Sequence, residues 1–183
     1  MLLINGSRSF LLEADFAAYE FATSFASQSN TVTHFNMEPT SLIDFPRQPY
    51  RWIHARMVVE VVERGLEDLS ENDLATMIEN LHLMRESGLK IAMDDTTWTK
   101  TEKYIIEKIH PDFIKTVDWH NLARSRERVG QAKIIAEMIE NNTLARVART
   151  LGADYLQGFY FPTPKIAVHI SQVINGSKTR SVA

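Results

Sequence analysis

The sequence predicts an α/β domain in which strands and helices alternate around a parallel sheet. Short segments rich in β-branched and other apolar residues are each followed by a segment with helical character, and the connections between them are short. This pattern indicates a parallel sheet with right-handed βαβ crossovers. The pattern fits either an open doubly wound sheet or part of an eight-fold (β/α) barrel. No Gly-rich phosphate loop follows the first expected strand and no Walker-type sequence occurs, which argues against a nucleotide-binding doubly wound fold.

Length and composition indicate one domain, residues 1–183. Hydrophobic content of 44% and charged content of 23% are ordinary for a globular protein that buries a sizeable core. A net charge of −3 gives no support for binding a nucleic-acid polymer or a membrane surface. The chain has no Cys, which excludes disulfides and suits a reducing cytosol. No apolar run reaches membrane-spanning length, so we expect a cytoplasmic protein, with a flexible polar tail at residues 176–183.

Six segments are expected to be strands. Residues 31–36 are rich in β-branched and aromatic side chains, and residues 57–63 are almost wholly apolar apart from their acids, as in strands covered on both faces. Residues 133–137 are expected to be a strand, although 131–140 could equally be helical by propensity. The full set of expected strands is 31–36, 57–63, 90–95, 113–117, 133–137 and 155–161.

Helices are expected between these strands, and the helix at residues 71–87 has the clearest end signals. Ser70, with Asp73 three residues on, approximates a capping box, and Gly88 stands where a left-handed C-cap is needed. The other expected helices are 9–29, 100–109, 119–128 and 143–151, and the Pro-rich segment 39–49 is expected to be a loop with one helical turn. In the first helix, an apolar stripe is expected to be the buried face: Phe10, Ala14, Ala17, Phe21 and Phe25.

Polar residues recur where the expected strands end. Asp94 and Asp95 are adjacent like charges, so they indicate a cation or a network of donors between them, unless one of them caps the next helix. In parallel α/β folds this end of the sheet carries the chemistry. Carboxylate and amide oxygens suit Mg²⁺ or Mn²⁺, and a Lys beside them could orient a water. The residues that share this position are Asn36, Glu60, Asp94, Asp95, Lys115, Glu137 and Gln157.

Each of these residues also has a structural explanation. Glu60 and Glu137 could be solvated strand ends, Lys115 could pair with an Asp, and Gln157 could cap a turn. Their recurrence at the end of strand after strand favours the joint interpretation. The six His residues are scattered, and we expect them to be surface or packing residues.

At these positions the sequence resembles the EAL domains, bacterial phosphodiesterases of the second messenger cyclic di-GMP. Asp94-Asp95 is similar to the family's Asp-Asp-Phe-Gly motif, and Lys115 matches the Lys of Lys-Ile-Asp. The remaining matches, in the family's order, are Asn36 on its strand, Glu60-Val61-Val62-Glu63 with Glu-Leu-Thr-Glu, Glu137-Met138-Ile139-Glu140 with Glu-Gly-Val-Glu, and Gln157-Gly158-Phe159-Tyr160-Phe161 plus Pro164 with Gln-Gly-Tyr-x-Phe-x-x-Pro. The resemblance covers about residues 10–165.

The resemblance implies an incomplete or divergent TIM-type (β/α) barrel with cyclic di-GMP across its mouth. It implies that divalent ions, Mg²⁺ or Mn²⁺ in an active member, are held by Asn36, Glu60, Asp94 and Asp95. It gives Lys115 and Glu137 the catalytic roles of orienting and supporting the attacking water. It places Gln157, Glu63 and Glu140 on the ligand side of the site, with Glu63 anchoring the loop after the central strand.

The departures from the family pattern are also informative. Val117 stands where the motif has Asp, Met138 replaces a Gly, and Thr96-Thr97 replaces Phe-Gly. The earlier strand that carries the Glu-Ala-Leu motif has no counterpart, and with it a metal-binding Glu and a phosphate-contacting Arg are missing. The segment between Lys115 and Glu137 is also shorter than in typical members. A site without these groups should lose most of its metal affinity and rate.

We therefore expect a degenerate EAL-like domain in bacterial cyclic di-GMP signalling, which binds the nucleotide or docks a protein with little or no turnover. One alternative is a metal-dependent phosphodiesterase that hydrolyses cyclic di-GMP to linear pGpG. Another is a partner-binding domain that ignores the nucleotide. An incomplete barrel leaves strand edges and apolar surface exposed, so self-association or a protein partner is expected.

Overall fold

Six parallel strands form one sheet in this protein. The computed structural model describes residues 2–28, 31–45, 56–118, 126 and 129–161. The strands are β1 (Thr33–Met37), β2 (Met57–Val61), β3 (Lys90–Met93), β4 (Phe113–Thr116), β5 (Lys133–Ala136) and β6 (Tyr155–Leu156). The helices are α1 (Leu2–Gln28), α2 (Pro39–Asp44), the short 3-10 helix η1 (Leu66–Asp68), α3 (Glu71–Glu86), α4 (Lys100–Ile109) and α6 (Asn142–Thr150).

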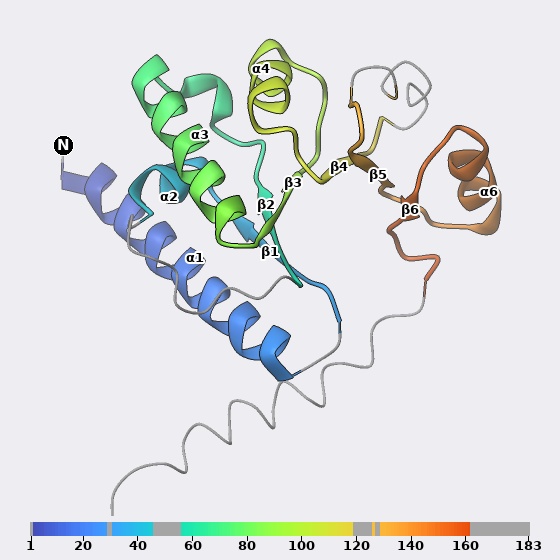
Figure 1. Cartoon of the computed structure of the whole chain (residues 1–183), viewed down its shortest axis with the longest axis horizontal. Helices are drawn as coiled ribbons and strands as arrows, with labels where there is room; N and C mark the ends of the chain where they lie inside the picture. Colours follow the sequence, from blue (N-terminus) through green and yellow to red (C-terminus); the bar gives the residue numbers. More distant parts are fainter. Residues whose placement is uncertain (1, 29–30, 46–55, 119–125, 127–128, 162–183) are drawn as a thin grey trace, which may run out of the picture.

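The strand order decides between the two architectures that the sequence left open. The strands lie in the order in which they occur in the chain, β1-β2-β3-β4-β5-β6, and every neighbouring pair is parallel. In a doubly wound sheet, the spatial order of the strands reverses at a switch point. In a barrel, each new strand is added next to the preceding one, always on the same side. Figure 1 shows α1, α3, α4 and α6 following one another around the strands. The fold is therefore an incomplete TIM-type barrel, open within the described residues.

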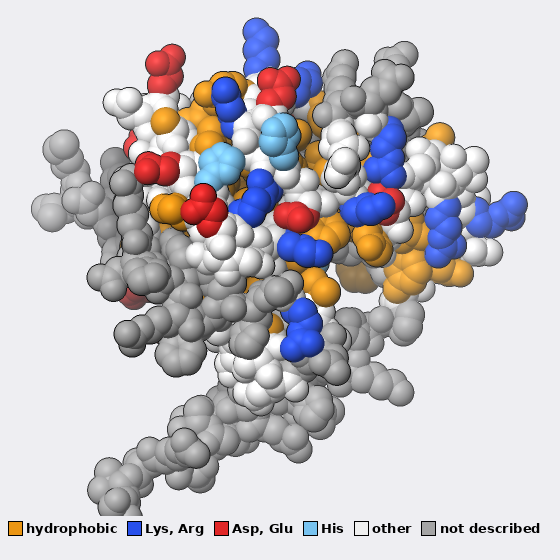
Figure 2. Space-filling view, viewed as in Figure 1, with side chains coloured by type: hydrophobic (Ala, Val, Ile, Leu, Met, Phe, Trp, Pro, Cys, Tyr) orange, Lys and Arg blue, Asp and Glu red, His pale blue; other side chains and the backbone are white. Residues whose placement is uncertain are grey.

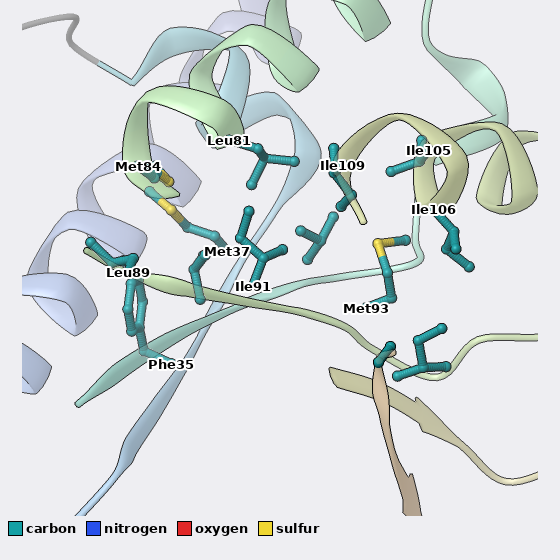
Figure 3. Packing of buried hydrophobic residues seen from close by; sticks show 14 of the residues in the cluster. Phe35, Met37, Leu81, Met84, Leu89, Ile91, Met93, Ile105, Ile106 and Ile109 are labelled. Carbon is teal, nitrogen blue, oxygen red and sulfur yellow. The ribbon is translucent and has the colours of Figure 1, made fainter. Parts of the chain in front are cut away.

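The apolar core lies between the helices and one face of the sheet. Ile91 and Met93 point from β3 toward the helices and pack under Leu81 of α3 and Ile109 of α4 (Figure 3). Because successive strand residues point to opposite faces, Ala92 and the following Asp94 belong to the other face. Each strand thus contributes alternate side chains to the core and to the surface on which the polar residues gather.

The predicted N-cap of α3 by Ser70 and its left-handed Gly88 are confirmed. The Ser70 side chain accepts a hydrogen bond from the backbone N–H of Asp73 at 3.1 Å. Gly88 has φ +103°, a left-handed conformation that Gly adopts without a steric penalty. Residues 133–136 of the predicted strand 133–137 form β5, so the helical alternative for residues 131–140 is wrong.

The predicted buried face of α1 is wrong. Phe10 is 70% exposed and Phe21 is 38% exposed. The buried residues are instead Tyr19, Ala22 and Ala26. Two apolar stripes run along this helix, and the stripe with small alanines lies against the sheet because it allows close approach. Tyr19 also packs edge-on against two rings of the core, which gives this stripe an aromatic anchor.

The last strand is shorter than predicted, since β6 covers only two of the expected residues. After it the chain turns back, and the N–H of Tyr160 donates to the carbonyl of Ile139 at 2.9 Å. The expected helix at 119–128, apart from residue 126, and the polar tail lie outside the described residues. Among the helices in the described ranges, none combines the length and the apolar composition needed to cross a bilayer.

Candidate functional site

One ammonium group joins three carboxylates at the carboxyl ends of the strands. Lys115 on β4 places its Nζ 2.8 Å from Oε2 of Glu60, on β2. The same Nζ lies 2.5 Å from Oδ1 of Asp94, after β3, and 3.3 Å from Oε1 of Glu137, after β5. All four side chains are buried. The contacts therefore connect the ends of four neighbouring strands.

The pleat of the strands brings these residues to one face. Phe113, Lys115 and Val117 alternate along and just beyond β4, and all three line the same cavity. The residues between them, Ile114 and Thr116, are fully buried on the other side of the strand. The predicted convergence of strand-end residues is thus observed for Glu60, Asp94, Lys115 and Glu137.

The charges of this cluster shift the pKa values of its members. Burial alone would raise the pKa of Glu60, but hydrogen bonds from His34 and Lys115 lower it overall. Burial would lower the pKa of Lys115, and its bonds to Asp94 and Glu60 raise it instead. Lys115 is therefore a permanent ammonium, which can donate hydrogen bonds but cannot act as a base.

Glu137 is the member of the cluster that titrates near neutral pH. Burial, together with the charges of Asp94 and Asp95, raises the pKa of Glu137 to about 7, although Lys115 opposes the shift. Its Oε2 atom is buried and has no hydrogen-bond partner within the described part of the chain. A buried carboxylate oxygen without a partner is costly, so this atom is suited to holding a proton, a water or a cation.

A second group of carboxylates lies beside the first. Glu63, Asp94 and Asp95 each offer an oxygen, and these three atoms lie within 4.8 Å of one another. Asp95 has φ +40°, a left-handed conformation that Asp tolerates better than most residues. With Glu60 and Glu137, the two groups contain five carboxylates, three of which contact the Lys115 ammonium. This excess of negative charge and of hard oxygen donors fits a divalent cation.

The loop after Asp95 is held by a buried carboxylate on α4. Glu102 accepts hydrogen bonds from the backbone N–H groups of Thr97 at 3.1 Å and Thr99 at 2.7 Å. Thr99 is the N-cap of α4 and completes a capping box with Glu102. The suggestion that Asp94 or Asp95 caps the helix is therefore wrong. Both acids lie before the cap.

A cavity of about 1010 Å³ opens beside the cluster. Glu60, Lys115 and Glu137 form one part of its wall, and Gln157 lies near them. The rest of the wall is largely apolar and aromatic, including Phe113, Val117, Met138, Tyr155 and Phe159. In Figure 2, charged side chains of both signs are scattered over the visible face, while an apolar area lies beside α6. A large apolar cavity with a few convergent polar groups is the usual form of a small-molecule site.

The departures from the family motifs are visible in this cavity. Val117, at the motif's Asp position, faces the cavity and is well exposed. Met138 has φ +56°, which explains why a Gly is favoured at this position. At Gly158, by contrast, the motif Gly is kept. Any other residue would clash there, because a Cβ would lie 2.2 Å from the carbonyl oxygen of Ile139.

The remaining predicted residues do not contact the Lys115 cluster among the described contacts. Asn36 is exposed and lies in register with Glu60 on the neighbouring strand. Glu140 is exposed and does not line the cavity, whereas Gln157 does.

His34 was missed by the sequence analysis. It is exposed and packs beside Phe113, as expected of a surface or packing histidine, but its Nδ1 also lies 2.6 Å from Oε1 of Glu60. His34 precedes Asn36 by two residues and therefore shares its face, which is the only signal in the sequence.

Comparisons with solved structures identify the fold. The EAL domain of FimX from Pseudomonas aeruginosa, bound to c-di-GMP, matches with a TM-score of 0.73 and 14% identity, over 88% of this chain and 74% of that one. The Bacillus subtilis YkuI protein, in complex with substrate c-di-GMP and calcium, matches with a TM-score of 0.62 and 17% identity, over 94% and 50%. Klebsiella pneumoniae BlrP1, in a manganese and cyclic di-GMP complex, matches with a TM-score of 0.64 and 21% identity, over 86% and 45%.

The winding of the sheet and the position of the polar cluster define a barrel-type α/β domain with its candidate site at the carboxyl ends of the strands. Its fold is that of the EAL domains. The chain spans about half the length of the Bacillus and Klebsiella proteins. No protein-family model and no curated protein sequence matches it.

Proposed function

We propose that this chain is a degenerate EAL-like domain that acts in the cytoplasm in bacterial cyclic di-GMP signalling. It binds the nucleotide in the cavity, or docks a protein, with little or no turnover. The observation that carries this proposal is the cluster of Glu60, Asp94 and Glu137 around Lys115 at the edge of a large, mostly apolar cavity. The similar FimX and YkuI structures contain cyclic di-GMP, which supports the choice of ligand.

A divalent cation, Mg²⁺ or Mn²⁺, would be held by Asn36, Glu60, Asp94 and Asp95, and Glu63 is close enough to contribute. When bound, such an ion supplies Lewis-acid stabilisation of a phosphodiester. The nucleotide carries two phosphates, which the carboxylates of these two groups repel. We therefore expect that nucleotide binding is strengthened by the cation.

Low turnover follows from the residues that face the ligand. Val117 offers no ligand atom at the position where the motif has Asp. Lys115 is surrounded by three carboxylates and stays protonated, so it can orient a water only as a donor. Glu137 can hold or take up a proton at Oε2, but this alone does not assemble a complete site. Binding without efficient hydrolysis is the expected result.

Calorimetric titration of cyclic di-GMP into the full chain tests the proposal. The titration is made with Mg²⁺ or Mn²⁺, with Ca²⁺ and with EDTA, and the sample is then analysed for linear pGpG. We expect micromolar binding without product, and at least tenfold weaker binding in Asp94→Asn, where the carboxylate next to Lys115 loses its charge. Glu107→Gln, which removes an exposed carboxylate on α4, is the matched control and should bind normally. Absence of heat under all conditions would exclude the nucleotide and leave protein docking.

The alternative function is a metal-dependent phosphodiesterase that forms linear pGpG. It is favoured by Glu137, whose raised pKa of about 7 is suited to proton transfer at neutral pH. Val117→Asp separates the two functions. If the rest of the site is assembled, this change should raise product formation in Mn²⁺ at least tenfold from its starting level. Steady product formation by the unaltered chain would establish the enzyme instead.

A further inference from the structure

The Glu60 carboxylate is held at both of its oxygens. His34 Nδ1 lies 2.6 Å from Oε1, and Lys115 Nζ lies 2.8 Å from Oε2. The Lys115 contact belongs to the cluster already described. The His34 contact comes from β1, at the other side of β2, and has no counterpart in the motifs of the sequence. Glu60 is thus fixed between two donors that reach it from two different strands.

The tautomer of His34 follows from its partner. Glu60 is ionised, because hydrogen bonds to His34 and Lys115 outweigh its burial and lower its pKa. An ionised carboxylate only accepts hydrogen bonds, so the His34 Nδ1 atom must carry the proton. The bond is therefore Nδ1–H to Oε1, a charge-assisted hydrogen bond.

The His34 imidazole packs beside an aromatic ring and borders the cavity. Its ring lies 5.8 Å from the ring of Phe113, centroid to centroid, on the same face of the sheet. Its side chain is 31% exposed and lines the cavity. Rotation of the Glu60 carboxylate would break the bond to His34 or the bond to Lys115. Both oxygens keep a lone pair, so the carboxylate is restrained in orientation but still able to bind a cation.

We infer that His34 is a positioning residue that orients Glu60 for the divalent cation without contacting the cation itself. This inference rests on the cation site proposed above. Hydrogen-bond partners of metal ligands fix the ligand geometry, and their loss lowers metal affinity by 10- to 100-fold. His34 is the residue that performs this function for Glu60 on the side away from Lys115.

The test is titration of Mn²⁺ into the nucleotide-free full chain, followed by calorimetry and by Mn²⁺ electron paramagnetic resonance. His34→Ala should weaken Mn²⁺ binding by about 10- to 100-fold. His34→Asn, whose side-chain NH₂ can replace the Nδ1–H donor, should recover most of the affinity. His82→Ala, which removes an exposed histidine on α3, is the control and should bind as the unaltered chain does. Circular dichroism must show the same helix content in all variants.

Two further readouts separate positioning from a general structural role. In a Glu60→Gln background, His34→Ala should cause little additional loss of Mn²⁺ affinity, because the group that His34 orients no longer has its charge. Nitrogen NMR of the cation-free chain should show the proton of His34 on Nδ1. Unchanged Mn²⁺ affinity in folded His34→Ala would overturn the inference alone. Absence of Mn²⁺ binding by the unaltered chain would overturn both the inference and the proposed cation site.

Discussion

Glu137 shows how one side chain can couple the site to the stability of the whole domain. One of its oxygens contacts Lys115, and the other is buried without a partner among the described residues. Burial is the largest cause that raises its pKa to about 7, from an ordinary value of 4.5. The folded protein therefore binds this proton more tightly than the unfolded chain does between these two pH values.

The sign of the resulting pH dependence is fixed by this shift. The stabilisation from the bound proton is fully present below about pH 4.5 and is lost as the pH rises through 7. Glu137→Gln has no proton to lose, so its free energy of unfolding, relative to that of the unaltered chain, should increase by about 3 kcal/mol at most between pH 5 and pH 8. Urea unfolding at both pH values measures this difference. Glu107→Gln should show no such trend. If the free energy of unfolding of Glu137→Gln changed with pH in the same way as that of the unaltered chain, the prediction would be wrong.

Single residues also mark the limit of what the sequence can predict here. Glu60, Asp94, Lys115 and Glu137 could be predicted as one group, because each follows a recognisable strand end and parallel strands end at one edge. The bond between His34 and Glu60 could not, since it joins residues 26 positions apart and depends on the register of β1 against β2.

At the scale of elements, the segment between β3 and α4 depends on Glu102. This carboxylate is only 3% exposed and accepts two backbone N–H bonds from the loop that follows Asp95. The loop contains two residues in the left-handed region, Asp95 and Trp98. Such conformations persist only where the surrounding structure fixes them. We infer that Glu102 fixes these two conformations through its bonds to the loop.

Glu102→Ala should therefore destabilise the domain and loosen the loop. Loss of the capping box and of the bonds to Thr97 and Thr99 should cost roughly 2–3 kcal/mol of the free energy of unfolding. Amide hydrogen exchange at residues 95–99 should increase more than in the rest of the chain. Glu107→Ala, an exposed site on the same helix, should change neither quantity. Equal exchange in the loop of both variants would show that Glu102 does not hold it.

The ends of helices were predictable where residues close in the sequence determine them. The caps of α3, at Ser70 and Gly88, are local features, and both are confirmed. The buried face of α1 depends on which of two apolar stripes meets the sheet, and no local signal decides that. After β6, the backbone of Gly158 lies against that of Ile139, a contact between segments 19 residues apart that no local signal predicts.

At the scale of the whole molecule, the sequence predicted two possible architectures, an open doubly wound sheet or part of an eight-fold barrel. Alternating strands and helices are common to doubly wound sheets and barrels, and only the spatial order of the strands separates them. The observed order leaves β1 and β6 with a strand neighbour on one side only, within the described residues. Unpaired edges of this kind, next to exposed apolar side chains, favour association.

The exposed stripe of α1 provides the final prediction. Phe10 and Phe21 are 70% and 38% exposed, on the helix that packs beside the edge strand β1. We expect light scattering to give a mass above that of one chain, and the double variant Phe10→Ser, Phe21→Ser to shift it toward the monomer, because the association loses its apolar surface. Phe159→Ser, at the opposite end of the sheet, is the matched control and should leave the mass unchanged. If Phe159→Ser alone yields the monomer, the association uses the β6 end instead. A stable monomer of the unaltered chain at all concentrations would refute self-association through either edge.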